Sequence, residues 1–286
     1  MRKFSPPYRT LEEAFFDYPR QEKRRLCKEA GLPASSDVGV LAAFIQTLRS
    51  RVETHLGGRP ISGAAVSVPH FWALYAEDLE DVFEYLGLIY LQHYPYWHGG
   101  IFYEAGAAYA SNGFGLCSNY TDVKACTAER RHPSHQRQRE NVLTVGYTSG
   151  MLTSTWSHQG MWFAQPPAEN ILYTVADFSL GHDNKPDSGG SREADYSAFV
   201  RDALLTPLLE ANRYMRLVTH KVVLHGDCAD DKRFQTVVEE ALAVAARNLN
   251  DSDVFAEDVT YATAKGAAEM AKRIWWTYNH TGNSSL

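Results

Sequence analysis

The segment Lys221–Cys228 (KVVLHGDC) points to the fold of this chain more directly than any other. Its first four residues have the content of a buried β-strand, and His225–Cys228 then form a glycine-containing turn that leads into a helix. Such a turn presents free backbone N–H groups and the positive end of a helix, where an anion or a nucleotide can dock. The sequence therefore predicts an α/β protein with an anion-binding turn after this strand.

Four further segments of the chain predict helices and strands around this turn. Ala262–Glu269 (ATAKGAAE) opens a helix whose small residues allow another helix to cross closely. Ile61–Pro69 (ISGAAVSVP) reads as a strand that ends in Val-Pro before a helix. Glu104–Gly113 (EAGAAYASNG) reads as a glutamate followed by an Ala-rich helix, and Asn141–Thr153 (NVLTVGYTSGMLT) as two strands around a turn.

In their order along the chain, these segments resemble the actin-like ATPases, the superfamily of actin, the sugar kinases and the seventy-kilodalton heat-shock chaperones. The resemblance is to the nucleotide-binding domain of the chaperones, and it covers roughly residues 40–280. It implies an α/β, ribonuclease H-like fold of two lobes, of which the first is incomplete. It also implies that the helices at 102–112 and 262–279 cross at the base of the cleft between the lobes.

The implied domain organisation has three parts: residues 1–35 as an N-terminal helical extension, 36–140 as a partial first lobe, and 141–286 as the second lobe with its C-terminal connecting helix. Within the first part, residues 10–30 are expected to form a charge-rich amphipathic helix. Ser35–Asp37 then provides an N-cap for a helix over about 38–56. The apolar face predicted for this helix consists of Val40, Leu41, Phe44, Ile45, Leu48 and Val52.

The resemblance also assigns site residues. Glu104 matches the family's glutamate near the nucleotide and the metal, where it would hold a metal-bound water. ATP or ADP, with Mg²⁺, is the implied ligand, and no protein ligand to the metal is predicted. The implied nucleotide-binding residues are Thr148, Ser149 and Gly150 in the second phosphate loop, Gly226 and Asp227 in the adenosine turn, and Gly266 in the connecting helix.

Each of these residues also has a purely structural interpretation. Glu104 can stabilise a helix dipole, and Asp227 can cap the helix that follows it. The turn at 148–150 can simply join two strands of a hairpin. Gly266 can serve close helix packing, because a glycine inside a helix is otherwise unfavourable.

The departures from the family concern the phosphate half of the site. The first phosphate loop, an Asp-x-Gly-Thr hairpin, has no counterpart, since residues 1–60 read as helix and loop. In the second phosphate loop Gly146 stands at the Asp position, and Thr148 and Ser149 replace two glycines. Without these carboxylates, Mg²⁺ placement and water activation lose their ligands. The sequence therefore favours a pseudo-ATPase with weak or no ATP hydrolysis, acting as a nucleotide-binding or interaction module.

Two alternative functions remain open. An active ATPase would need a phosphate loop upstream of this gene model, and it would still lack the aspartate at Gly146. A serine/threonine-type hydrolase is suggested by Gly146–Gly150 (GYTSG), which has the form of a nucleophile elbow, and by His98–Gly100, which resembles an oxyanion-hole segment. An elbow requires a helix directly after its turn, whereas Met151–Trp156 looks like a strand.

Composition and charge limit the possible classes of partner and the cellular location. The net charge of −6 disfavours a nucleic-acid binder. The chain has no apolar run of the roughly 18 residues that a membrane span needs, and its N-terminus lacks an apolar signal-peptide core. The four cysteines have no CxxC spacing, so reduced thiols in a cytoplasmic protein are expected. On this basis the glycosylation sequons at Asn119 and Asn279 are interpreted as chance, and the aromatic run at 90–97 as lobe packing or a surface for a protein partner.

Overall fold

The chain divides into two compact units in the computed structural model. The first comprises Met1–Ala65 and Phe71–Gly99, and the second comprises Val66–His70 and Gly100–Leu286. The domain boundaries predicted after residues 35 and 140 differ from the limits of these two units, and they stay predictions. The structure describes residues 10–70, 75–93, 101–131, 140–159, 171–186, 191–215, 219–245 and 253–280.

The first unit is mainly helical. Its elements are α1 (Leu11–Glu29), α2 (Ser36–His55), α3 (Ala76–Tyr85), the 3-10 turn η1 (Leu91–His93), and the parallel pair of β1 (Gly63–Ala64) with β3 (Ile89–Tyr90). The two long helices begin where side chains satisfy their first N–H groups. Thr10 accepts from the N–H of Glu13 and Ser35 from that of Val38, each at 3.2 Å. The predicted N-cap at Ser35 is thereby confirmed.

Charged side chains connect α1 to α3. The Arg24 guanidinium is buried, with 6% of the residue exposed, and it donates to Asp78 at 2.7 Å and to Asp81 at 2.5 Å. Lys28 adds a contact of 2.9 Å to the other oxygen of Asp81. Burial by itself lowers the pKa of Arg24, but its hydrogen bond to Asp78 and the nearby carboxylates raise it overall. Arg24 therefore remains charged, and each buried charge has a partner.

The apolar face predicted for α2 is mostly exposed. Val40 is 72% exposed, Phe44 63% and Leu48 45%, whereas Val38 and Ala42 form the buried side of the helix. Leu41 and Ile45 of the predicted face are partly buried beside Val38 and Ala42. The predicted burial is therefore correct in part for Leu41 and Ile45, and wrong for Val40, Phe44, Leu48 and Val52.

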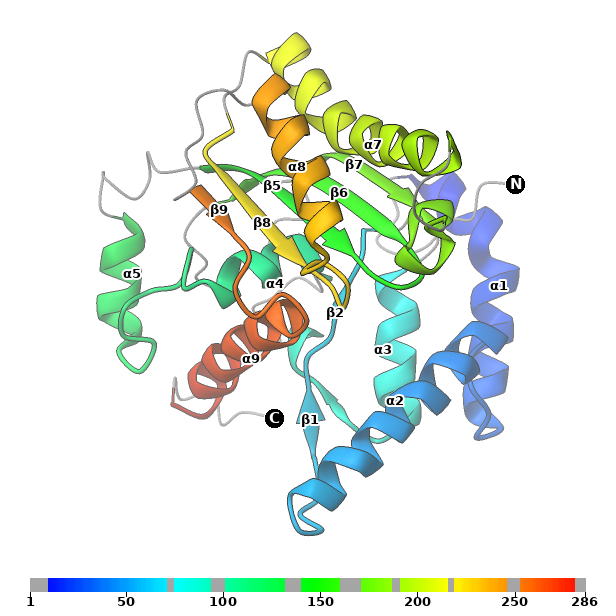
Figure 1. Ribbon diagram of the computed structural model, residues 1–286. Helices are drawn as coiled ribbons and strands as arrows, with labels where there is room; N and C mark the ends of the chain where they lie inside the picture. Colours follow the sequence, from blue (N-terminus) through cyan, green and yellow to red (C-terminus); the bar gives the residue numbers. More distant parts are fainter. Residues whose placement is uncertain are drawn as a thin grey trace. The chain divides into compact units, whose positions relative to one another are not determined.

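The second unit is built on a mixed five-stranded sheet in the order β7-β6-β5-β8-β9 (Figure 1). Strands β5, β6 and β7 are antiparallel neighbours, β8 runs parallel to β5, and β9 runs parallel to β8. The α/β class and the strand predicted over 221–224 are confirmed. The strands are β5 (Glu140–Tyr147), β6 (Leu152–Gln159), β7 (Ile171–Asp177), β8 (Lys221–His225) and β9 (Val254–Phe255).

Helices cover both faces of this sheet (Figure 1). Leu143 and Val145 point to the face covered by α7 (Ser191–Met215) and α8 (Lys232–Ala245). Val142 points to the opposite face, where it packs with Ala108 and Tyr109 of α4. The alternation along β5 follows from the two-residue period of a strand. The second face is covered by α4 (Glu104–Ser111) and α9 (Ala262–His280), and α4 follows the parallel pair of β2 (Ser67–Val68) and β4 (Phe102–Tyr103).

The crossing of α4 and α9 confirms the contact predicted between the helices at 102–112 and 262–279. Gly266 lies at the crossing point, where a Cβ atom built on it would overlap the carbonyl oxygen of Ala107. The backbones of the two helices therefore meet directly, and only glycine fits at this position.

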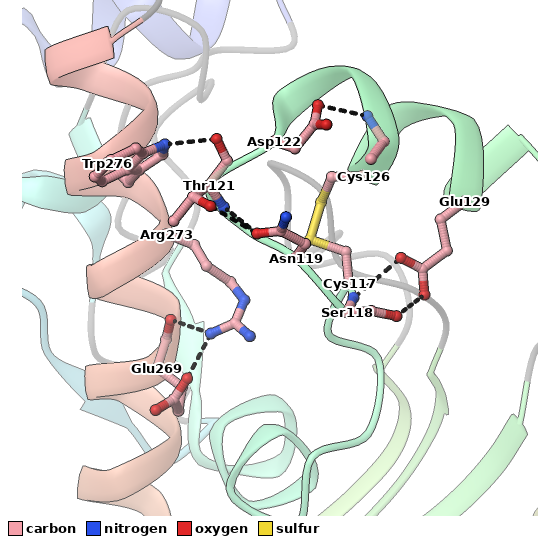
Figure 2. Close-up of a disulfide and its surroundings, with 11 residues drawn as sticks. Cys117, Ser118, Asn119, Thr121, Asp122, Cys126, Glu129, Glu269, Arg273 and Trp276 are labelled. Carbon is pink, nitrogen blue, oxygen red and sulfur yellow. Dashed lines mark hydrogen bonds and ion pairs between the residues drawn. A yellow bond between two sulfur atoms is a disulfide. The ribbon is translucent and has the colours of Figure 1, made fainter.

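A disulfide joins Cys117 to Cys126 beside α9 (Figure 2). This bond corrects the expectation that all four cysteines are reduced thiols; Cys27 and Cys228 are free. The second cysteine lies in α5 (Val123–Arg131). The sequence separation of nine residues did not predict the disulfide, because pairing depends on the distance between the Cα atoms, which is 5.4 Å here.

None of the described helices combines the length and the apolar character that a membrane crossing requires.

Candidate functional site

Two of the predicted site segments meet at one edge of the sheet. Strands β5 and β8 are parallel neighbours, so the turns after them, at 148–151 and 226–231, lie side by side. The backbone N–H of Ser149 donates to a carboxylate oxygen of Asp227 at 3.1 Å. The carboxyl ends of parallel strands are the usual place for ligands in α/β sheets. The proposed phosphate loop and adenosine turn therefore form one candidate site.

The turn at 148–151 is closed by its own hydrogen bonds. The N–H of Thr148 donates to the carbonyl of Met151 at 3.0 Å, and the Thr148 hydroxyl accepts from the N–H of Met151 at 3.1 Å. These bonds make it the tight turn of the β5–β6 hairpin. The donors of Thr148 are thus used internally, whereas a Cβ built on Gly150 would meet open space.

Asp227 does not cap the helix that follows it. The cap is Asp231, which accepts from the N–H groups of Arg233 and Phe234, both at 2.9 Å. Lys185 also binds Asp231, at 2.8 Å. Burial by itself raises the pKa of Asp231, but these hydrogen bonds lower it overall. The structural interpretation of Asp227 as a cap was therefore wrong, and sequence reasoning missed Asp231 although it directly precedes α8.

The space beside Gly146 is filled. A Cβ atom built at Gly146 would overlap the Thr153 hydroxyl and would lie 2.6 Å from Cε1 of His225. These three residues are neighbours across β6, β5 and β8. His225 is 4% exposed, and burial lowers its pKa to about 4, so that a neutral imidazole occupies this position at pH 7. An aspartate cannot be restored at position 146 without moving His225.

Gly226 is required by chain packing. Its φ of +113° is a conformation that other residues rarely adopt, and a Cβ there would overlap the carbonyl oxygen of Tyr147. The same oxygen accepts from the N–H of Cys228 at 3.2 Å. The glycine therefore lets the β8 turn lie against the end of β5. Its presence needs no ligand to explain it.

Glu104 is the first residue of α4 and follows β4 directly. Burial raises its pKa from 4.5 to about 7, so the carboxyl group can hold or release a proton near neutral pH. Gly266 meets α4 one turn further on, at Ala107. Among the described residues, no hydrogen bond or ion pair joins Glu104 to Ser149 or Asp227. The structure thus brings the two turns together, and separately places Glu104 near the helix crossing.

Sequence reasoning missed His70. It follows β2 as Glu104 follows β4, and the register of this parallel pair aligns Val68 with Tyr103. The His70 ring packs edge-on against Tyr103 with 4.7 Å between centroids, and burial lowers the pKa of His70. The available signal was the Val-Pro-His order at the end of a predicted strand. Two titratable groups with shifted pKa values therefore follow the same pair of strands.

Two further features were candidates among the described residues: a metal-binding group and a cavity. Within the described residues, no three His, Cys, Asp or Glu side chains are grouped to hold a metal ion. A cavity of about 490 Å³ in the first unit is lined by Arg20, Arg24 and Ser35 among others, and both arginines are paired with acidic residues. Residues 94–100, which include His98–Gly100 and most of the aromatic run, lie outside the described residues.

A scan of the chain against models of protein families finds no match, and a search of curated proteins finds no match either.

Proposed function

We propose that this chain is a degenerate member of the actin-like superfamily, a pseudo-ATPase that binds adenine nucleotide weakly and does not hydrolyse ATP. The observation that carries this proposal is the strand order of the second unit. Three antiparallel strands are followed by two parallel ones in the order β7-β6-β5-β8-β9, with helices between the later strands. This is the order of a ribonuclease H-like sheet, the building unit of the actin-like fold. The crossing of α4 and α9 at Gly266 supports it independently.

The residues that would contact the phosphates do not support hydrolysis. ATP turnover depends on carboxylates that position Mg²⁺ and the attacking water. At position 146 the neutral ring of His225 fills the volume that such a carboxylate would need. In addition, the Asp227 carboxylate accepts the Ser149 N–H that a phosphate oxygen would otherwise accept. The site therefore contains its own anion, which competes with a phosphate and repels it.

Asp227→Ser tests this arrangement directly. The substitution frees the Ser149 N–H and removes the charge, while Asp230→Ser removes an exposed charge from the same turn and leaves the Ser149 contact in place. We expect ATP, ADP and adenosine with Mg²⁺ to raise the melting temperature of the wild type by small and similar amounts. In Asp227→Ser the shifts with ATP and ADP should exceed the shift with adenosine, because ligand binding to the native state stabilises it by mass action.

Two results would contradict the proposal. Equal strengthening of ATP binding by Asp230→Ser and by Asp227→Ser would show that the Ser149 contact is irrelevant. Mg²⁺-dependent phosphate release by the wild type that is lost in Glu104→Gln would identify a working ATPase. Gly226→Val is unsuitable as a test of adenosine binding, because the added side chain would disrupt the contact with Tyr147.

The hydrolase alternative receives no support from the turn geometry. Residues 146–150 join two antiparallel strands, and β6 begins at Leu152 directly after them. A nucleophile elbow needs a strand, a turn and then a helix. Absence of labelling by a fluorophosphonate probe is the expected outcome for this chain.

A further inference from the structure

The loop closed by Cys117 and Cys126 carries an exposed acceptor sequence. Asn119, Tyr120 and Thr121 form an Asn-x-Thr sequon, and the Asn119 side chain lies on the surface. Both cysteines are buried, with 3% and 4% of each residue exposed. The sequon therefore sits on a loop whose two ends are covalently joined.

Within the turn, the side-chain oxygen of Asn119 accepts hydrogen bonds, whereas the amide nitrogen takes no part. The side-chain oxygen accepts from the Thr121 N–H at 3.1 Å and from the Thr121 hydroxyl at 2.7 Å. The amide nitrogen has no hydrogen-bond partner among the described residues, and Figure 2 shows no dashed line to it. A structural role in the turn is therefore fulfilled by the oxygen alone. The nitrogen, the atom that would carry a sugar, belongs to an exposed residue and is not used by the turn.

Neighbouring helices hold this turn in place. The N–H and hydroxyl of Ser118 donate to Glu129 of α5 at 3.0 and 2.9 Å. Trp276 of α9 donates to the carbonyl of Thr121 at 3.2 Å. Between them, the Tyr120 ring lies 5.1 Å from the Lys272 ammonium group on α9. Tyr120 thus packs against α9 while Asn119 projects into solvent.

The disulfide indicates the compartment in which the sequon would be modified. Structural disulfides form and persist in oxidising compartments and are rare in the cytosol. In eukaryotic cells N-linked glycans are added in the same secretory compartment. A bonded Cys117–Cys126 pair around an exposed sequon therefore argues against chance, and it also argues against the cytoplasmic location expected from the sequence.

We propose that Asn119 is an N-glycosylation site and that this protein matures in an oxidising secretory compartment. The donor is an oligosaccharide linked to a lipid through a diphosphate. The Asn119 amide nitrogen forms a bond to C1 of the first sugar while the bond from C1 to the diphosphate oxygen breaks. The lipid diphosphate leaves with that electron pair, and the amide proton passes to a base of the transferase. This inference does not depend on nucleotide binding.

The first experiment uses the protein isolated from its own organism. Peptide mapping after treatment with peptide-N-glycosidase should show Asn119 converted to aspartate. Site mapping is required because Asn250, Asn279 and Asn283 also begin Asn-x-Ser/Thr sequences. Cys117 and Cys126 should resist alkylation until a reductant is added. An unmodified Asn119, or freely alkylated Cys117 and Cys126, would overturn the proposal.

Matched variants, expressed in the same organism, separate the glycan from the turn. Asn119→Asp keeps the oxygen that accepts from Thr121, so the protein should fold and lose one glycan. Thr121→Ala should lose the same glycan, whereas Thr121→Ser should retain it. Loss of glycan in Thr121→Ser together with Thr121→Ala, at unchanged secretion, would show that the threonine side chain acts only through the fold and would count against the sequon.

Discussion

Replacing Glu104 by glutamine should stabilise the protein at alkaline pH and leave its stability unchanged at acidic pH. Burial at the start of α4 raises the pKa of Glu104 from 4.5 to about 7. One pKa unit corresponds to about 1.4 kcal/mol, so the ionised carboxylate lowers the free energy of unfolding at pH 8 by about 2–3 kcal/mol, after allowance for its partial exposure. Glutamine has similar volume and does not ionise.

The sign follows from proton binding. Because the folded-state pKa is the higher one, the folded protein binds more protons than the unfolded chain between about pH 4.5 and 7. The stability contributed by Glu104 is therefore complete below pH 4.5 and is lost as the pH rises through 7. His225 acts oppositely, because burial lowers its pKa to about 4, and its contribution is lost as the pH falls below 6.5. His225 is present in both proteins, so its effect cancels in their difference.

Urea denaturation of wild type and Glu104→Gln at several pH values between 4.5 and 8 measures this difference. We expect a value near zero at pH 4.5 that grows to about 2–3 kcal/mol in favour of the variant at pH 8. Glu257→Gln, at an exposed position, serves as the control and should give a flat difference. A flat difference for Glu104→Gln, or a wild type that is the more stable protein at pH 8, would show that a partner stabilises the Glu104 carboxylate and would refute the reasoning.

Three further predictions concern packing, charge and the disulfide. Gly266→Ala should lower the free energy of unfolding by about 3 kcal/mol or more, because its Cβ would overlap the α4 backbone, whereas Gly150→Ala, at an open site, should change it little in the same urea titration. Arg24→Met should cost about 3–5 kcal/mol in chemical denaturation, since it removes the guanidinium that pairs with the buried Asp78 and leaves Asp81 with Lys28 alone; an effect below about 1 kcal/mol would mean that water reaches these carboxylates. Reduction of Cys117–Cys126, which closes a loop with a sequence separation of nine, should cost about 2.5 kcal/mol and lower the melting temperature measured with reductant.

Local patterns sufficed for two elements of the second unit, whereas α5 (Val123–Arg131) lies in a polar stretch that the sequence indicated as a loop. The apolar, β-branched content of Lys221–Leu224 predicted β8, and the run of small residues from Ala262 predicted a helix that another helix approaches closely. Both depend on properties that neighbouring residues share: a strand exposes its side chains with a two-residue period, and glycine is rarely kept inside a helix without a packing reason. These features are readable before any long-range contact is known.

Other features depended on which partners the fold brought together. The large apolar residues of α2 were expected on one packed face, yet Val40 and Phe44 are exposed because the buried side of α2 is centred on Val38 and Ala42. Likewise, α1 is joined to α3 by Arg24 and its acidic partners. A helical period identifies a face but not the surface that covers it.

In the candidate site, too, some features could be predicted from the sequence and others depended on the tertiary structure. By itself, the sequence predicted turns after β5 and β8, and it has glycine at position 146, where the family that it resembles has an aspartate. Only the tertiary structure decided that Asp227 accepts the Ser149 N–H, that His225 fills the space at Gly146, and that Cys117 and Cys126 are bonded. The physical reason is distance: hydrogen bonds, steric exclusion and disulfides each act over a few ångströms, whereas the residues that they join, such as Ser149 and Asp227, are as far as 78 positions apart in the chain.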